Sequence, residues 1–201
     1  MKNLTLFAFL LIVSISLCAQ NNPNMTTTLP YREIPAYPES YSAESVAARM
    51  IDGLGFRFYW ATEGLRPEDL AFRPSPEART TEETIDHILG LSTMILNAMK
   101  NQINVRSGEE TSSLSFEVKR KKTLEILKEA SDLLKQEGTK LEDHKIMSQF
   151  GANKSEWPFW NLINGPISDA LWHVGQVVTF RRSSGNPFNS KANVLTGKVR
   201  E

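Results

Sequence analysis

Two histidines and one aspartate are the residues of this chain whose types and spacing could bind a metal ion. Asp169 and His173 are four residues apart, and a helix would place both side chains on one face, one turn apart. His87 falls on the apolar face of an earlier helical pattern. Two imidazoles and one carboxylate leave coordination positions open, as in catalytic zinc sites and non-haem iron sites. A histidine paired with an aspartate in a core is the alternative explanation.

Three further residues are candidates for the pocket or the second shell of such a site. Gln176 lies one turn after His173 on the same face, where it could orient a ligand or serve only as a packing amide. Tyr59 and Glu63 could line the pocket from the first helical segment. His144 lies in a polar stretch and is expected on the exposed surface. The sequence assigns no catalytic residue.

Four helical segments must position these residues. They are predicted over residues 42–65, 80 or 81 to 103, 115–137 and 165–185. Thr80 and Glu83 have the spacing of a capping box, and Gly165-Pro166 is a usual helix start. The link from 138 to 166 is long for helical bundles, whose connections usually take ~2–8 residues. Because no convincing alternating strand is found, an all-α fold is expected: a four-helix bundle over 40–185 with a long crossover between helices 3 and 4.

Both ends of the chain are expected to lie outside this bundle. Residues 1–19 combine a basic start, a short apolar run and small residues near a cleavage point, which is typical of a signal peptide. The protein is therefore predicted to be exported, either to the periplasm or out of the cell, with an uncleaved anchor and a lipidated Cys18 as alternatives. Residues 20–39 read as an extended leader and residues 186–201 as a polar tail.

Composition excludes several classes of function. Cys18 is the single cysteine among 201 residues, so cleavage after Ala19 would leave no disulfide, catalytic thiolate or thiolate metal ligand. The chain has 23 basic and 23 acidic residues, which gives no electrostatic case for nucleic-acid binding. No transmembrane segment is expected after signal cleavage.

The motif around His173 resembles that of a known superfamily. His173-Val174-Gly175-Gln176 is similar to the His-Arg-Gly-Gln signature on the last helix of the DinB/YfiT-like proteins, whose metal site has three histidines. His87 matches the ligand on their second helix, and His173 matches a ligand on their last helix. Asp169 stands where their pattern has histidine, and Val174 stands where it has arginine.

This resemblance implies a divalent metal, commonly zinc or nickel, in a bundle that often forms a homodimer. It also implies thiol-dependent transferase or isomerase chemistry. Asp169 is a harder, negatively charged ligand, which favours zinc, manganese or iron. The function expected is that of an exported metal-dependent enzyme acting on a small molecule, as a thiol-dependent transferase or a hydrolase. Enzyme activity itself stays open, because a non-catalytic ligand-binding bundle, or a dimeric interaction bundle using Trp157–Trp160, is the alternative.

Overall fold

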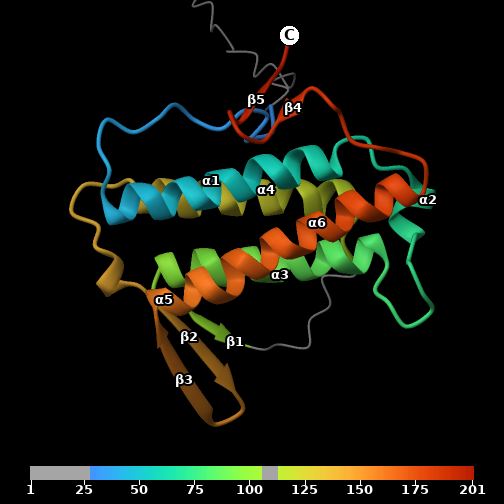
Figure 1. Cartoon of the computed structure of the whole chain (residues 1–201). Helices are drawn as coiled ribbons and strands as arrows, with labels where there is room; N and C mark the ends of the chain where they lie inside the picture. The colour runs from blue at the N-terminus through green and yellow to red at the C-terminus, as the bar shows by residue number, and fades with distance from the viewer. Residues whose placement is uncertain (1–27, 106–112) are drawn as a thin grey trace, which may run out of the picture.

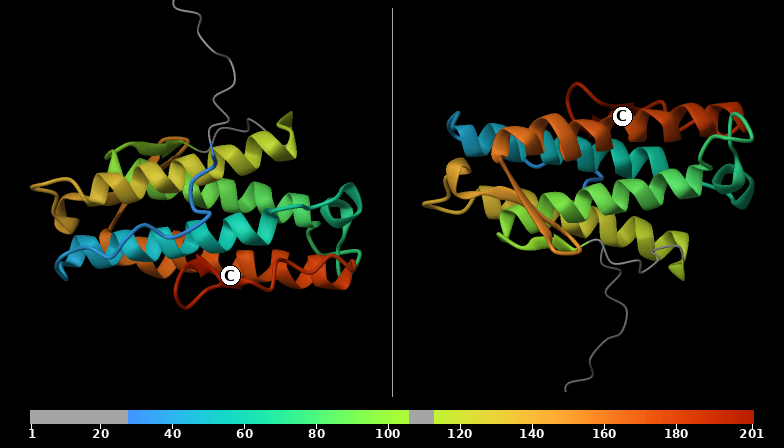
Figure 2. Two further views of the ribbon diagram at one scale, coloured as in Figure 1. Left: turned by 90° about the horizontal axis from the view of Figure 1, so that it is seen from above. Right: turned by 90° about the horizontal axis from the view of Figure 1, so that it is seen from below.

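Four long helices form the body of the molecule. The computed structural model describes residues 28–105 and 113–201, so the predicted signal peptide, Cys18 and the start of the leader lie outside the described residues. The long helices are α1 (Ala43–Thr62), α3 (Thr81–Met99), α4 (Phe116–Leu134) and α6 (Ser168–Ser183). Helices α1 and α3 each pack on both α4 and α6, and their buried side chains form one core (Figure 1; Figure 2).

Side-chain caps explain where three of these helices begin. Ser42 and Ser45 bond each other's backbone N–H groups at the start of α1, and Thr80 and Glu83 do the same at the start of α3. Each reciprocal pair satisfies two backbone donors that the first helical turn leaves without partners. Ser115 caps α4 by accepting from the N–H of Val118. The predicted helix starts at these three points are therefore confirmed.

The prediction of an all-α fold is wrong, because the segments between and after the helices contain two sheets. Strand β1 (Ile103–Val105) pairs parallel with β2 (Lys145–Phe150), and β2 pairs antiparallel with β3 (Asn153–Pro158). Strands β4 (Ala192–Asn193) and β5 (Lys198–Val199) form a second, two-stranded sheet. The predicted crossover of 138–166 thus contains a β-hairpin, which projects beyond the helices in Figure 1. Its strands show little apolar alternation because β3 is exposed along its whole length.

Short helices occupy two other connections. Helix α2 (Pro67–Ala71) follows α1, with Pro67 in the first turn, where its missing N–H removes no hydrogen bond. A 3₁₀ turn (Leu141–Asp143) precedes β2. Across residues 28–105 and 113–201, no helix is both long enough and apolar enough to traverse a bilayer.

The helix that carries Asp169 and His173 begins earlier than predicted. Helix α5 (Phe159–Leu162) continues through a π-helical turn (Ile163–Ile167) directly into α6. Pro166 lies inside the π turn and is not the helix start that its pairing with Gly165 suggested. The wider turn accommodates a ring that would disturb a regular α-helix. Ser168 then donates its hydroxyl to the carbonyl of Ile163 at 2.6 Å, just before the candidate metal ligands.

The described part of the leader is fastened along α1. The Tyr31 hydroxyl donates to Asp52 Oδ1 at 2.9 Å, and Lys135 pairs with Asp52 Oδ2 at 2.8 Å. The Tyr31 ring lies where a Cβ at residue 55 would sit, so Gly55 is the residue that permits this close approach. The backbone N–H of Ile34 also donates to the carbonyl of Gly197, which joins the leader to the C-terminal segment (Figure 1).

Asp69 ties the α1–α2 connection to the end of α6. Its buried carboxylate accepts hydrogen bonds from Arg66, from Ser184 Oγ at 2.6 Å and from Asn186 Nδ2 at 2.6 Å. The bond from Arg66 is the largest of the causes that hold the pKa of Asp69 well below its usual range, although burial opposes it. The ionised carboxylate is therefore a source of stability.

We expect Asp69→Asn to lower the free energy of unfolding at pH 7 by about 2–3 kcal/mol, because bonds to a charged acceptor are lost. A carboxyl group with a depressed pKa in the folded state contributes stability above its unfolded pKa near ~3.9, and that contribution disappears as the pH falls toward the folded pKa. The gap between wild type and variant in urea unfolding should therefore narrow below about pH 4. Glu68→Gln is the matched control, because Glu68 is an exposed partner of Arg66. A gap that stays constant from pH 7 to pH 3 would contradict this role.

Candidate metal centre

Helices α3 and α6 bring His87, Asp169 and His173 together. One ligand atom from each of the three residues lies within 4.8 Å of the other two. His87 Nε2 is 3.4 Å from Asp169 Oδ2, and His173 Nε2 is 3.3 Å from Asp169 Oδ1. The two imidazole rings are perpendicular, with centroids 4.5 Å apart. Both histidines thus direct Nε2 toward the carboxylate of Asp169.

The helical period of α6 accounts for this placement. At about 100° per residue, Asp169, His173 and Gln176 share one side of the helix. The buried residues Ala170, Val177 and Arg181 lie roughly a quarter turn away and anchor α6 in the core. The candidate ligands therefore lie at the edge of the α3–α6 contact and not in the centre of the core. Their side chains are 33% (His87), 37% (Asp169) and 14% (His173) exposed, which leaves a path for a small molecule.

Gln176 holds the other nitrogen of His173. His173 Nδ1 lies 2.8 Å from Gln176 Oε1, a distance at which a proton on Nδ1 is donated to the amide oxygen. With that proton on Nδ1, a neutral His173 directs the lone pair of Nε2 at Asp169 Oδ1. A lone pair facing a carboxylate oxygen at 3.3 Å is unfavourable unless a cation lies between them. A metal ion and a second proton on the ring both meet that requirement.

The surroundings of His87 favour its neutral form. Burial is the largest cause that lowers the pKa of His87, followed by the positive charge of Arg79; a protonated His173 would act in the same direction. The carboxylate of Asp169 opposes these effects but does not outweigh them. A neutral imidazole is the form that binds a metal. Because the pKa of His87 is lowered, protons compete only weakly with a metal ion for this residue.

Two of the donor distances already suit a bound ion. Ligand bonds of about 2.0–2.2 Å place the donors of one metal roughly 3.0–3.6 Å apart. Both imidazole–carboxylate distances already lie in this range, each to a different oxygen of Asp169. The three donors together lie within 4.8 Å of one another, so they must move closer to bind a single ion. His87, Asp169 and His173 could therefore hold a metal ion.

The other predicted site residues have different partners. Glu63 pairs with Arg120 of α4, and the same guanidinium lies 4.6 Å from the centre of the Tyr59 ring. Tyr59 and Glu63 therefore lie where α1 meets α4. Among the described residues, neither has a polar contact with His87, Asp169 or His173. His144 is half-buried, not fully exposed as expected, and its Nδ1 has no hydrogen-bond partner within the described residues.

The aromatic cluster of the crossover is divided between the core and the surface. Phe159 is buried, whereas Trp157 and Trp160 are 41% and 72% exposed. Trp172 of α6 is also 73% exposed. The cluster therefore does not act only as a plug for the core.

Sequence reasoning missed Arg79, whose charge lowers the pKa of His87. This arginine directly precedes the cap of α3, eight residues before His87. Such a spacing is not a recognised metal-site pattern, so only the fold reveals the influence of Arg79.

Comparisons with known proteins identify no relative of this chain. No protein-family model matches the chain, and neither a curated protein nor a solved structure matches it. The case for a metal centre therefore rests on the contacts of His87, Asp169 and His173.

Replacing Gln176 with alanine is expected to weaken Zn²⁺ binding by about 10–100-fold, because the hydrogen bond that orients His173 would be lost. Titration calorimetry on metal-free protein measures the change. Thr179→Ala is the control, since Thr179 is exposed on the same helix. Gln176→Glu keeps an acceptor for Nδ1–H and should bind Zn²⁺ close to wild type. Equal affinity of Gln176→Ala and wild type would mean that the amide does not orient a ligand.

Proposed function

We propose that the protein is a metal-dependent enzyme of the DinB/YfiT-like type that acts on a small molecule. The observation that supports this proposal is the convergence of His87 Nε2, His173 Nε2 and the Asp169 carboxylate at the partly exposed edge of α3 and α6. Three protein ligands at a site that small molecules can reach fit catalysis better than a closed structural metal site. The superfamily resemblance also leads us to propose a homodimer. The signal-peptide pattern of residues 1–19 leads us to propose that the protein is exported.

Each residue has a distinct role in this proposal. His87 and His173 each present Nε2, and Asp169 supplies a negative charge that offsets part of the charge of a divalent cation. Gln176 keeps the proton of His173 on Nδ1. A divalent ion bound here supplies Lewis acidity, which lowers the pKa of a coordinated water or thiol. Because the DinB/YfiT-like resemblance implies such chemistry, we propose thiol-dependent transfer or hydrolysis as the reaction class. The thiol would come from a substrate, since the mature chain predicted from the sequence contains no cysteine.

The two-imidazole, one-carboxylate set suits several divalent metals. This set is found in catalytic zinc sites and in non-haem iron(II) sites. Manganese and nickel are also in the proposal, since carboxylate and imidazole oxygen and nitrogen donors bind both. Zinc, iron(II), manganese and nickel should therefore be compared on the same metal-free preparation.

Cobalt(II) substitution tests whether the site has an open coordination position. Metal-free protein loaded with one equivalent of Co²⁺ should give visible absorption bands of a nitrogen- and oxygen-bound ion. Adding 2-mercaptoethanol should then produce a sulfur-to-cobalt charge-transfer band if the thiol coordinates. His87→Ala should lack the original bands, whereas His144→Ala, which removes a histidine outside the site, should keep them. If neither a thiol nor a small anion changes the cobalt bands, the site has no open coordination position. That result would contradict the proposal of a metal-dependent enzyme.

A non-catalytic interaction module is the second candidate. The exposure of Trp160 and Trp172 favours it, because large exposed aromatic side chains are typical of contact surfaces. In this alternative, the metal site would only stabilise the fold. A closed cobalt site with unchanged bands would favour it over the enzyme.

A further inference from the structure

A cavity lies on the side of α6 that faces α1. Leu171, Val174, Gly175, Val178 and Arg182 line it from α6, at spacings of three and four residues. Viewed along the helix, this side is roughly opposite the side that carries Asp169, His173 and Gln176. The cavity is therefore separate from the candidate metal centre, and the inference drawn from it does not depend on the proposed function.

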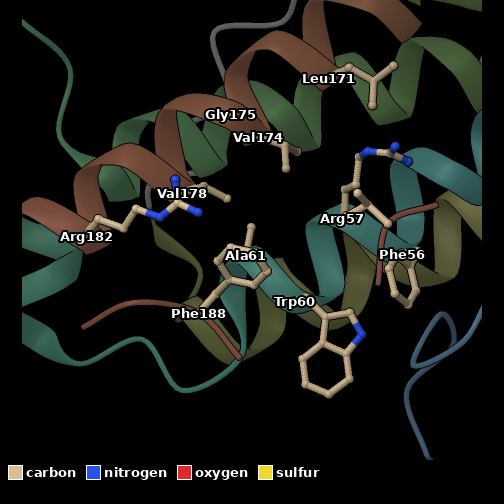
Figure 3. Close-up of a pocket in the computed structure, with 11 residues that line it drawn as sticks. Phe56, Arg57, Trp60, Ala61, Leu171, Val174, Gly175, Val178, Arg182 and Phe188 are labelled. Atoms are coloured by element: carbon tan, nitrogen blue, oxygen red, sulfur yellow. The ribbon is translucent and has the colours of Figure 1, made fainter. Parts of the chain in front are cut away.

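The cavity is apolar along its walls and is covered in part by the C-terminal segment. Trp60 contributes from α1, and Phe188 contributes from the segment after α6 (Figure 3). The volume is about 360 Å³, which lies at the small end of the range for pockets that hold small molecules, ~300–1,000 Å³. This size suits one small molecule with an apolar body.

Two arginines are the charged residues that line the cavity. Figure 3 shows Arg57 and Arg182 on either side of Val174, with apolar side chains between them. Arg57 donates to the carbonyl of Gly53 at 3.0 Å, and the Arg182 guanidinium lies 5.4 Å from the centre of the Phe188 ring. Neither arginine has a carboxylate partner within residues 28–105 and 113–201, and no acidic residue lines the cavity. Both guanidinium groups thus retain hydrogen-bond donors for an external anion.

We propose that this cavity binds a small amphipathic organic acid, with its apolar body between α1 and α6 and its carboxylate on Arg57 or Arg182. The apolar walls exclude water from the body of the ligand, and the guanidinium groups form charge-assisted hydrogen bonds with the anionic end. A neutral ligand of the same shape would leave the anion-binding donors unused. The arrangement therefore selects for charge as well as for an apolar chain.

Decanoate and decanol form a matched pair of probes for this proposal. Titration calorimetry on wild-type protein should show one saturable site for decanoate and at least tenfold weaker binding of decanol. The double variant Arg57→Gln/Arg182→Gln should lose at least tenfold in affinity for decanoate and change little toward decanol. Decanol binding as tight as decanoate, or decanoate binding unchanged in the double variant, would overturn the assignment of the arginines. The absence of saturable decanoate binding at millimolar concentration would overturn the whole proposal.

Filling the cavity tests its location. A Cβ at Gly175 meets no atom within 4 Å, so Gly175→Leu should fill the cavity without a backbone clash and should abolish decanoate binding. Gly90→Leu is the matched control, because Gly90 is an exposed helical glycine of α3 with equally open space around its Cβ. A cooperative thermal unfolding transition for each variant would show that it is folded. Wild-type decanoate binding by folded Gly175→Leu would place the ligand elsewhere and overturn the proposal. If Gly175→Leu does not fold, Val178→Trp serves as the second filling variant under the same criterion.

Discussion

His173→Ala is expected to lower the affinity of the protein for Zn²⁺ by about 100-fold or more. Structural zinc sites with four ligands bind with about 10–16 kcal/mol, or roughly 3 kcal/mol for each ligand, and every 1.4 kcal/mol is about tenfold in affinity. His173 has the most buried side chain of the three candidate ligands and is the one oriented by Gln176. Competition against a chromophoric chelator measures the affinity.

Two further variants make this result specific to the site. His144→Ala removes a histidine outside the candidate centre and should bind Zn²⁺ as wild type does. Asp169→Asn keeps the shape of the side chain but removes its charge, so it should weaken Zn²⁺ binding as well. Should His173→Ala bind Zn²⁺ as tightly as His144→Ala, the pairing with Asp169 would be a structural contact and not a metal site.

Arg181→Met is expected to lower the free energy of unfolding by about 3–5 kcal/mol, because several carbonyl groups would lose the hydrogen bonds that the Arg181 guanidinium donates. Arg181 Nη1 donates to the carbonyls of Trp60, Ala61 and Glu63 at 2.9–3.2 Å, and Nε donates to the carbonyl of Asn186 at 2.6 Å. The carbonyls of Trp60 and Ala61 belong to the last turn of α1 and that of Glu63 to its C-cap, where the helix provides no backbone donor for them. Arg181 is 2% exposed, and burial is the main cause of the lowered pKa of its guanidinium.

Arg182→Met is the control for this effect on stability. Arg182 is the next residue of α6, is exposed and contacts the Phe188 ring, so its replacement should change the free energy of unfolding by less than about 1 kcal/mol. Urea unfolding followed by far-UV circular dichroism measures both variants. Similar midpoints for Arg181→Met and Arg182→Met would show that the bonds to the end of α1 add little.

The long helices could be predicted because their signals are local. Thr80 and Glu83 lie three residues apart and cap each other, and apolar residues then recur at helical spacing. The hairpin of β2 and β3 lacks such a signal. In β2 only Ile146 is buried, and in β3 the whole strand is exposed, so neither shows the alternation typical of a half-buried strand. Pro166 misled the prediction because the π turn that accommodates it cannot be read from residue types.

The candidate ligands could be identified because periodicity within a helix fixes which side chains share a face. Asp169 and His173 needed only the period of α6, and His87 needed only the period of α3. Their distances could not be predicted, since these depend on how α3 packs against α6. The partners of Tyr59 and Glu63 could not be predicted for the same reason. Tyr59 lies on α1 and Glu63 is its C-cap, and both contact Arg120 of α4.

Anomalous diffraction from crystals of untagged protein grown with Zn²⁺ is the most direct test of the metal centre. The account predicts one zinc peak between α3 and α6, within about 2.0–2.2 Å of His87 Nε2, His173 Nε2 and one Asp169 carboxylate oxygen. The remaining coordination positions should hold water. A zinc peak at other residues, or direct imidazole–carboxylate hydrogen bonds at this position in crystals saturated with Zn²⁺, would contradict the account.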